Sequence, residues 1–417
     1  MRLLIVSQYF WPENFRVNDL VIELVQRGHQ VTVLTGYPNY PDGKVYPAFH
    51  ANPLEYSRYA GADVVRVPMT SRGQNGFTLV LNYFTFAISA SAIGPWKLRG
   101  RKFDGIFVFE PSPITVGIPG AVLRFIKRAP LVFWVLDLWP ETLHAVGAVQ
   151  SKVALRAVGG LVKLIYMQCD LILAQSKSFL PQIQKYAPAD ARVEYFPSWS
   201  ESNFDLTKAN LAEEIVADPA MFNVMFAGNI GDAQDFPAIL SAAEKLKDNS
   251  RIRWLIVGDG RKSTWVAEQI KARGLQNCVI LLGRYPLERM PSFFKHADAL
   301  LVSLKNEPVF ALTIPGKVQS YLAAGIPIVA MLNGEGAQVV SDAHAGFSCP
   351  AGDTEGLARI VLKLSMMSKE ELQVMGDNGI EFSLREFSRE KLVDRLESWL
   401  MDFPEQRRKS VLLGGRP

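Results

Sequence analysis

The sequence predicts an α/β protein built from two doubly wound domains, each a parallel sheet covered by helices. Short apolar runs typical of buried parallel strands alternate with helical periodicity over residues 3–196, and the alternation starts again at residue 222. The stretch 197–210 between the two series is polar and aperiodic, which indicates a linker. We therefore expect one domain at residues 1–200, a second at 205–383, and an amphipathic helix at about 384–403.

The totals support this size and limit the classes of partner. A chain of 417 residues, 48% hydrophobic and 21% charged, is long enough to bury two cores. Its formal net charge of +4 is too small to indicate a polyanionic partner, so we expect no nucleic-acid binding. Cys169, Cys278 and Cys349 lack metal-ligand spacing and cannot all pair, which favours a reducing compartment.

Secretion and membrane-spanning segments are not expected. The apolar run at the N-terminus is too short for a signal sequence and is broken by Gln8 and Pro12. No uninterrupted apolar segment elsewhere reaches the roughly 20 residues that a membrane helix needs. We therefore expect a cytoplasmic protein, and contact with a membrane surface stays open.

The beginning of the chain predicts a parallel βαβ unit. Strands are expected at residues 3–6 and 31–34, with a helix between them whose apolar face covers 17–24. Ligands of such sheets bind beyond the carboxyl ends of the strands. The loops at 8–16 and 35–44 are therefore expected at a binding edge.

The segment 77–102 allows two interpretations. Its first part is aromatic and aliphatic, and a basic cluster of Lys97, Arg99, Arg101 and Lys102 follows Trp96. The segment could lie in a bilayer interface with its basic end over anionic head groups. It could equally be a core helix with a solvated basic end.

The remaining elements follow the same alternation. Strands are expected at 105–109 and 131–135, and the loops after them, from Glu110 and from Asp137, belong to the same binding edge. Further along the chain we expect a helix at 151–168 and strands at 171–174, 193–196, 222–226, 255–257, 279–282 and 299–302.

Residues 305–330 predict a loop, a helix and a short strand. Pro315, Gly316 and Lys317 suit a first helical turn, Gly325 suits the position after the helix, and an apolar strand follows at 328–330. A helix N-terminus offers free N–H groups and a positive dipole end, and here a lysine comes with it. This is a place for an anion, most simply a diphosphate, although an ordinary crossover helix has the same pattern.

Glycine-rich turns follow several strands of the second series. Gly228, Asn229 and Gly231 come directly after one predicted strand, and Gly258 and Arg284 belong to turns after the next two. Glycines in such turns let backbone N–H groups approach phosphates closely. These turns are expected on one rim with the helix at Lys317.

The segment at 315–327 resembles the nucleotide-sugar segment of family 4 glycosyltransferases, which have the GT-B fold. The shared pattern is P-x-K-x-x-x-Y-x-A-x-G-x-P. The motifs QYFWPENFR (8–16), RGHQVTVLTGYPNYPDGKVY (27–46), DLWPE (137–141) and PSWSESNF (197–204) resemble the WbuB-like branch, which is associated with O-antigen, capsule and colanic-acid assembly. The resemblance runs from residue 1 to about residue 360.

This resemblance implies a fold and an activity. The two Rossmann-like domains of a GT-B protein face each other across a cleft, and the helix at 384–403 is expected to pack back on the first domain. The implied reaction moves a sugar from a nucleotide diphosphate-sugar, preferably a UDP-sugar, to a lipid-linked glycan precursor with retention at the anomeric carbon. No cofactor is implied, and the implied location is the inner face of the cell membrane, as a peripheral protein.

The resemblance also assigns candidate residues. Catalytic candidates are Lys317, Asp137 and Glu13, and the apolar face of Trp139 suits a sugar ring. Each acceptor-side residue alone is more often structural, since an Asp at a strand end commonly caps the next helix. The donor-binding candidates are Gly228, Asn229, Gly231, Gly258, Arg284, Thr313, Ile314, Pro315, Lys317, Tyr321 and Glu335, and the acceptor-binding candidates are Arg16, Tyr40, Trp139 and Glu141.

The sequence departs from the family pattern at two places. Most members carry two glutamates eight positions apart, where this chain has Leu312 and Ser320. Glu335 is a candidate for the ribose contact that would otherwise be lost. Many members also place an arginine and a lysine near Asn229, and this chain does not, which leaves Lys317 as the main cation.

No metal site is expected. The chain has no Asp-x-Asp triplet, and its five histidines show no ligand spacing. Lysine, backbone amides and a helix dipole would then neutralise the leaving diphosphate. Two other functions stay open: a UDP-sugar 2-epimerase, for which the loop 305–316 offers only Glu307, and a catalytically silent partner of a polysaccharide assembly complex.

Overall fold

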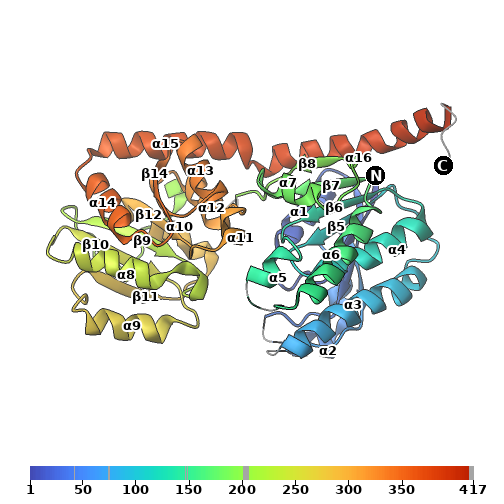
Figure 1. The fold of residues 1–417 in the computed structure, drawn as a ribbon, viewed down its shortest axis with the longest axis horizontal. Coiled ribbons are helices and arrows are strands. Elements are labelled where there is room, and N and C mark those ends of the chain that lie inside the picture. The colour runs from blue at the N-terminus through green and yellow to red at the C-terminus, as the bar shows by residue number, and fades with distance from the viewer. Residues whose placement is uncertain (42, 74–75, 146, 148, 201–205, 413–417) are drawn as a thin grey trace. The chain divides into compact units, whose positions relative to one another are not determined.

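The computed structural model describes residues 1–417 apart from 42, 74–75, 146, 148, 201–205 and 413–417, and side chains are described up to residue 403. The chain forms two compact units (Figure 1). The first contains Met1–Pro197 and Glu390–Pro417, and the second contains Ser198–Arg389. Each has a parallel sheet with helices on both faces, as the alternating sequence pattern predicts.

The sheet of the first unit has the order β3-β4-β2-β1-β5-β6-β7-β8, and only the short β3 pairs antiparallel. The order reverses between β1 and β5, so the loops after these two strands flank the point where ligands of such sheets bind. The strands are β1 (Arg2–Val6), β2 (Gln30–Gly36), β3 (Arg58–Tyr59), β4 (Ala62–Val67), β5 (Gly105–Glu110), β6 (Leu131–Val135), β7 (Leu171–Ala174) and β8 (Val193–Tyr195).

Helices of the first unit connect these strands. The longest before the C-terminal part is α3 (Gly76–Lys97), which packs against β2, β4 and α4. The others are α1 (Arg16–Gln26), α2 (Pro47–Ala51), α4 (Gly117–Lys127), α5 (Glu141–Ala145), α6 (Lys152–Tyr166), α7 (Phe179–Gln184) and α16 (Arg389–Leu412).

The second unit repeats the architecture with six parallel strands in the order β11-β10-β9-β12-β13-β14. Here the order reverses between β9 and β12. The strands are β9 (Phe222–Ala227), β10 (Ile252–Val257), β11 (Val279–Gly283), β12 (Ala299–Ser303), β13 (Ile328–Met331) and β14 (Gly346–Cys349). The helices are α8 (Phe236–Lys245), α9 (Ser263–Ala272), α10 (Met290–Phe294), α11 (Pro308–Ala311), α12 (Gly316–Ala324), α13 (Glu335–Asp342), α14 (Thr354–Ser365) and α15 (Lys369–Glu386).

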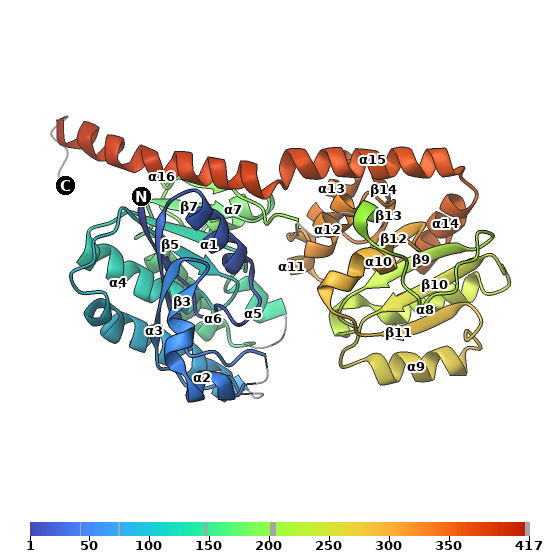
Figure 2. The same ribbon diagram turned by 180° about the vertical axis from the view of Figure 1, so that it is seen from behind.

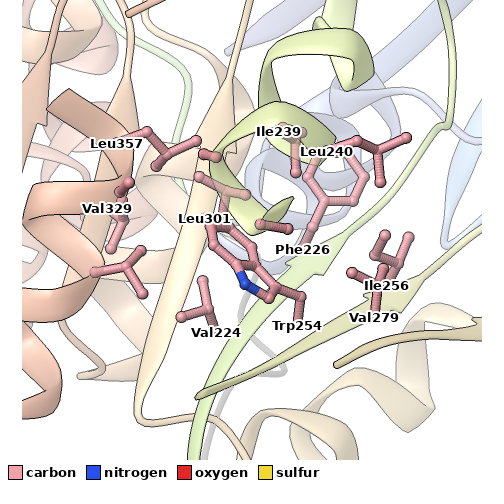
Figure 3. Packing of buried hydrophobic residues seen from close by; sticks show 14 of the residues in the cluster. Val224, Phe226, Ile239, Leu240, Trp254, Ile256, Val279, Leu301, Val329 and Leu357 are labelled. Atoms are coloured by element: carbon pink, nitrogen blue, oxygen red, sulfur yellow. The ribbon is translucent and has the colours of Figure 1, made fainter. Parts of the chain in front are cut away.

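Buried side chains on both faces of this second sheet form its core. Trp254, Phe226 and Leu301 point from three neighbouring strands toward Leu240 of α8 and Leu357 of α14 (Figure 3). A second cluster on the other face includes Tyr321 and Leu322 of α12. Both faces are apolar because a parallel sheet is covered on both sides, which explains the unbroken apolar runs of its strands.

The helix predicted at about 384–403 is two helices, and this corrects the expectation. α15 ends at Glu386 and α16 begins at Arg389. Phe387 lies between them with φ −121° and ψ 14°, which is not a helical conformation, and its ring is buried 5.9 Å from that of Phe382 in the core of the second unit. Burial of Phe387 interrupts a helical periodicity that continues on either side of it.

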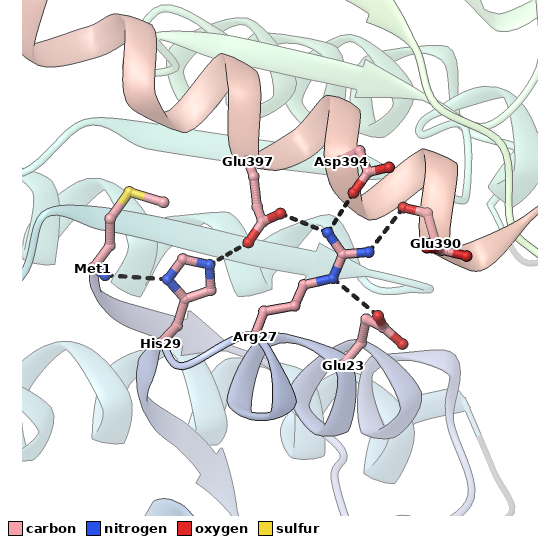
Figure 4. Close-up of polar contacts among 7 residues, drawn as sticks. All are labelled: Met1, Glu23, Arg27, His29, Glu390, Asp394 and Glu397. Atoms are coloured by element: carbon pink, nitrogen blue, oxygen red, sulfur yellow. Dashed lines mark hydrogen bonds and ion pairs between the residues drawn. The ribbon is translucent and has the colours of Figure 1, made fainter.

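An ionic cluster fastens α16 to the first unit. The guanidinium of Arg27, at the end of α1, contacts the carboxylates of Glu23 at 2.9 Å, Asp394 at 2.5 Å and Glu397 at 2.6 Å (Figure 4). His29 also contacts Glu397, and Figure 2 shows α1 close to α16. The apolar face of α16 buries Leu392, Val393, Leu396, Leu400 and Phe403.

Removal of the Arg27 charge is expected to destabilise the first unit. Only 18% of its side chain is exposed, and Arg27→Gln would remove the guanidinium that the largely buried carboxylates of Glu23 and Glu397 share. We expect a loss of roughly 1–3 kcal/mol in the free energy of unfolding, measured by urea denaturation. Arg58→Gln is the control, because the Arg58–Asp63 pair is exposed and such pairs contribute little. Equal effects of the two substitutions would contradict this assignment.

Candidate functional site

Helix α12 of the second unit begins where the sequence predicts it. Pro315 is its N-cap residue, the helix covers Gly316–Ala324, and Gly325 ends it with φ +68°. The positive φ favours glycine there, and a Cβ at Gly325 would also lie 2.6 Å from the end of the Ile380 side chain. The loop before α12 follows β12, one of the two strands at the reversal point.

Tyr321 anchors α12 to the end of β9. Its hydroxyl accepts a hydrogen bond from the Ala227 N–H at 3.2 Å and donates to the Ala227 carbonyl at 3.3 Å. The side chain is 1% exposed. The structure therefore corrects the expectation that Tyr321 contacts the donor directly, because its polar group is buried and occupied, and it holds the helix in position instead.

The ammonium group of Lys317 is buried at the start of α12. Within the described part of the chain, its Nζ has no hydrogen-bond partner, and it lies 3.4 Å from the centroid of the Phe226 ring. Burial lowers the pKa of Lys317 to about 7. The cation–π contact compensates for part of the free-energy cost of burying the ammonium, and a bound anion would compensate for the remainder.

Two turns at the ends of β9 and β10 approach each other and Lys317 through glycines. A Cβ at Gly228 (φ +134°) would lie 2.9 Å from the Lys317 Nζ, and a Cβ at Gly258 (φ +147°) would lie 1.8 Å from the Gly228 carbonyl oxygen. Only glycine fits either position. The structure thus brings Gly228, Gly258 and Lys317 together, as expected.

Some polar groups of the Asn229–Gly231 turn form hydrogen bonds with the nearby Gln234 side chain. Gln234 Oε1 accepts hydrogen bonds from the Gly231 N–H at 3.1 Å and from Asn229 Nδ2 at 3.3 Å. A neighbouring feature was missed by sequence reasoning: Lys262 and Lys305 pair with Asp232 at 3.1 and 4.0 Å. Lys305 comes three residues after the strand predicted at 299–302, a position that could have indicated it.

The other donor-side candidates divide into two groups. The loop before α12 lies against the start of α13, because a Cβ at Gly336 would be 2.9 Å from Pro315. Glu335 is therefore close to the 313–315 segment, in which the Ile314 side chain is buried and the Thr313 hydroxyl donates to the Phe310 carbonyl at 3.0 Å. Arg284 instead is exposed on the turn after β11.

Glu13 of the first unit binds backbone. Its Oε1 accepts from the N–H groups of Asn39 and Tyr40, both at 2.7 Å, and its Oε2 accepts from the Phe10 N–H at 3.0 Å. Burial raises its pKa to about 6, against these three hydrogen bonds. Because both oxygens are used, the structure corrects the expected catalytic role of Glu13 to a positioning role for the two loops after β1 and β2.

A buried group of acids lies at the ends of β5 and β6. Asp137 accepts hydrogen bonds from the Thr142 hydroxyl at 2.6 Å and from Trp139 Nε1 at 3.1 Å. Burial raises the pKa of Asp137, opposed by hydrogen bonds from Thr142, Trp139 and Ser112. Glu110 lies beside it, fully buried, and burial and then the charge of Asp137 raise the pKa of Glu110 well above its usual range.

Arg72 and Tyr83 connect the acceptor-side candidates, and sequence reasoning missed both. The Arg72 guanidinium lies 5.3 Å from the Tyr40 ring and donates to the Tyr9 hydroxyl at 3.3 Å. The Tyr83 ring is 6.4 Å from that of Trp139. Hydrogen bonds with Ser112 and Arg72 are among the interactions that influence the pKa of the Tyr83 phenol. Tyr40, Trp139 and Asp137 are thereby collected in one cluster.

Arg16 and Glu141 have partners of their own. Arg16 pairs with Asp19 at 3.8 Å, and Glu141 accepts from the Tyr186 hydroxyl at 3.2 Å. The other carboxylate oxygen of Glu141 is buried and has no partner among the described residues. Across the described ranges, no group of three or more His, Cys, Asp or Glu residues could hold a metal ion.

Comparisons with known proteins match both halves of the chain to glycosyltransferases. The model described as "Glycosyl transferase 4-like domain" matches residues 14–199, and the model "Glycosyl transferases group 1" matches residues 222–366. "Probable glycosyltransferase WbjE" of Pseudomonas aeruginosa is 24% identical over 328 residues, which cover 75% of this chain and 79% of that protein. "Putative colanic acid biosynthesis glycosyl transferase WcaI" of Escherichia coli K12 is 26% identical over 348 residues, 78% of this chain and 82% of WcaI.

Solved structures show the same fold. HepE of Anabaena, crystallised with UDP and glucose, has a TM-score of 0.65 at 17% identity and covers 96% of this chain and 99% of that one. WaaG, a glycosyltransferase involved in lipopolysaccharide biosynthesis, has a TM-score of 0.63 at 12% identity and covers 92% of this chain and 95% of that one. The chain belongs to the family 4 glycosyltransferases and has the GT-B fold of these enzymes.

Proposed function

We propose that the enzyme transfers a sugar from a UDP-sugar to a lipid-linked glycan precursor during synthesis of a bacterial surface polysaccharide. The observation that carries the proposal is the buried Lys317 ammonium, set at the N-terminus of α12 and against Gly228. A helix start, a glycine turn and a lysine are the components from which proteins build diphosphate sites. A UDP complex of HepE, which has the same fold, supports uridine as the base.

Electrostatic stabilisation is the main chemical contribution of this site. Lys317 without an anion is half-neutral near pH 7, because burial holds its pKa at about that value. A bound diphosphate would restore the full charge, and the attraction would grow as the bond from the anomeric carbon to the diphosphate oxygen breaks. The charge therefore acts most strongly when the leaving group departs.

We propose retention of configuration through attack on the same face. The acceptor oxygen bonds to the anomeric carbon while the sugar–diphosphate bond breaks, and the acceptor proton passes to an oxygen of the leaving diphosphate. This route needs no separate general base. It accords with Glu13 and Asp137, whose oxygens accept hydrogen bonds from Asn39, Tyr40, Phe10, Thr142 and Trp139.

The acceptor is assigned to the cluster around Trp139 in the first unit. Asp137 accepts from the indole N–H of Trp139 and so orients the ring, whose apolar face suits a sugar. Arg72 adds a cation next to Tyr9 and Tyr40, appropriate for a phosphate of a lipid-linked acceptor. Glu335, at the start of α13, is proposed for the ribose contact that Leu312 and Ser320 cannot make.

We further propose that α3 rests on the cytoplasmic surface of the membrane. Among the described helices, α3 alone is long and apolar enough to cross a membrane, contrary to the sequence-based expectation, and 28% of its most apolar window is buried. The helix packs on the sheet with one face and exposes Phe77 (78%), Ile88 (66%) and Trp96 (62%) with the other. Large exposed apolar side chains beside basic residues suit peripheral binding to an anionic surface.

The substitution Lys317→Met is expected to lower kcat and raise stability together. Loss of the charge should reduce kcat by about 100-fold or more, roughly 2.7 kcal/mol, in an assay of UDP release with a membrane extract. Without ligand, removal of the buried ammonium should increase the free energy of unfolding by about 1–3 kcal/mol. Lys363→Met is the control, since Lys363 is exposed and lies 3.8 Å from the centroid of the Phe347 ring.

The stability difference between the wild type and Lys317→Met is expected to depend on pH. The pKa of Lys317 is about 7 in the folded protein and 10.5 ordinarily, so the unfolded chain binds more protons between these values. The wild type should therefore gain stability as pH rises from 7 toward 10, relative to Lys317→Met.

If the activity of Lys317→Met lies within about threefold of the wild type, Lys317 does not belong to the site. UDP release without an acceptor, or none at all, would favour an epimerase or a silent partner.

A chelator is expected to leave the reaction largely unchanged. Lysine, backbone N–H groups and the dipole of α12 are proposed to carry the charge of the leaving diphosphate, which is the role of a divalent cation in other transferases. The measurement is UDP release after dialysis against EDTA, with and without added Mg²⁺ or Mn²⁺. A strict requirement for either ion would overturn the metal-free mechanism.

Binding to vesicles should depend on the basic end of α3. Lys97 donates to the Arg66 carbonyl and Arg101 pairs with Asp63, whereas Arg99 lies over Trp96 and Lys102 is exposed. At about 1 kcal/mol per charge, Arg99→Gln with Lys102→Gln should weaken sedimentation with anionic vesicles by about tenfold or more. Lys247→Gln with Lys271→Gln removes the same charge from exposed positions of the second unit. Equal binding of both double variants, or of anionic and neutral vesicles, would contradict the proposal.

A further inference from the structure

An apolar groove runs along α3 of the first unit. It has a volume of about 490 Å³ and lies between the segment that follows β4, residues 68–70, and one stripe of the helix. The stripe consists of Thr85, Ile88, Ser89, Ala92 and Ile93, which recur at the spacing of one helical face. Apart from Thr85 and Ser89 its side chains are hydrocarbon.

The two walls of the groove are fastened to each other. The Thr70 N–H donates to the Thr85 hydroxyl at 3.0 Å, and Asn82 Nδ2 donates to the Thr70 carbonyl at 2.6 Å. The Thr85 hydroxyl also donates to the Asn82 carbonyl at 3.1 Å. These bonds use the polar groups of Thr70 and Thr85 at the rim, so the groove is a built feature whose wall offers no free peptide group at Thr70.

This bonding pattern decides against a peptide that would bind as an added β-strand. A peptide that adds to a strand edge needs free backbone N–H and carbonyl groups, and both groups of Thr70 are taken. Hydrocarbon needs only apolar surface and room. The exposed Ile88 continues the apolar surface of the groove to solvent.

One end of the groove leads to a cation. Asn82, which holds Thr70, also accepts hydrogen bonds from the Tyr9 hydroxyl and from Gln8 Nε2, both at 2.8 Å. Arg72, two residues after Thr70, donates to the same Tyr9 hydroxyl. Arg72 is four positions after Pro68, at most about 14 Å of extended chain. A hydrocarbon chain in the groove would thus have its end close to a guanidinium.

We propose that this groove holds the hydrocarbon chain of a lipid phosphate, with the phosphate at Arg72. The proposal rests on the lipid-linked acceptor proposed above and adds the place where the lipid part of that acceptor binds. A lipid phosphate consists of a hydrocarbon chain that ends in an anion, which matches an apolar groove that is followed by Arg72. Ile88 belongs both to the groove and to the exposed face of α3, so binding must be measured without vesicles to separate the groove from a bilayer contact.

The test uses farnesyl phosphate as the probe, at concentrations below those at which it forms micelles. Its affinity for the full-length protein, measured by calorimetry without donor, UDP or vesicles, should exceed that of farnesol and that of inorganic phosphate. Ala92→Phe fills the groove and should weaken farnesyl phosphate binding by about tenfold or more. Ala272→Phe adds the same ring to an exposed helical position of the second unit and should change nothing.

Arg72→Gln separates the two halves of the site. It should bring the affinity for farnesyl phosphate down to that for farnesol, while farnesol binding itself stays the same. A photoreactive farnesyl phosphate should label residues 68–70 or 85–93 in the wild type and lose this labelling in Ala92→Phe. An unchanged urea unfolding transition of Ala92→Phe excludes general misfolding as the cause.

Several results would overturn the inference. They are equal binding by the wild type and Ala92→Phe, labelling elsewhere on the chain, and binding only when vesicles are present. No sugar transfer is measured in these experiments, so their failure is distinct from failure of the proposed function. If only the proposed function failed, farnesyl phosphate would bind, but no UDP would be released from a UDP-sugar in the presence of membrane extract.

Discussion

The buried amino group of Lys317, which has no hydrogen-bond partner among the described residues, is the constraint on which the second unit's site depends. Lys317 carries its ammonium to the Phe226 ring, and the surrounding elements are shaped to allow this. Gly228 leaves the space for the lysine side chain, Gly258 lets the next turn approach Gly228, and Tyr321 ties α12 to β9. Such a site costs stability until an anion binds, which is typical of a binding site and not of a core built for stability.

In the first unit, carboxylates position loops and rings. Glu13 joins the loops after β1 and β2 through three backbone N–H groups, and Asp137 holds Trp139 and Thr142. Both lie at the carboxyl edge of the sheet, next to the point where the strand order reverses. Carboxylates that accept several hydrogen bonds give these loops a fixed conformation, which the proposed acceptor site would need to align a hydroxyl.

Helix α3 serves different purposes on its different faces. Asn82 and Phe86 are buried against the unit, Thr85 and Ala92 line the groove, and Phe77 and Trp96 are exposed. Figure 1 shows α4 beside α3, and α4 exposes Phe125 as well. An ordinary amphipathic helix has a polar outer face, so the apolar outer face of α3 requires a partner to cover it, which the proposals above identify as lipid.

Local patterns in the sequence determined most of the parallel strands, though not β4 or β14, the start of α12 at Pro315, the glycine turns after β9 and β10 and the family, because each depends on neighbours within a few residues. Only the tertiary structure decided the roles of Glu13 and Tyr321, the cluster of Arg72 with Tyr9 and Tyr40, and the break between α15 and α16. These depend on contacts between segments far apart in the chain. Whether a carboxylate accepts backbone bonds or stays free, and whether a tyrosine is buried or open, is a matter of packing that no local pattern specifies.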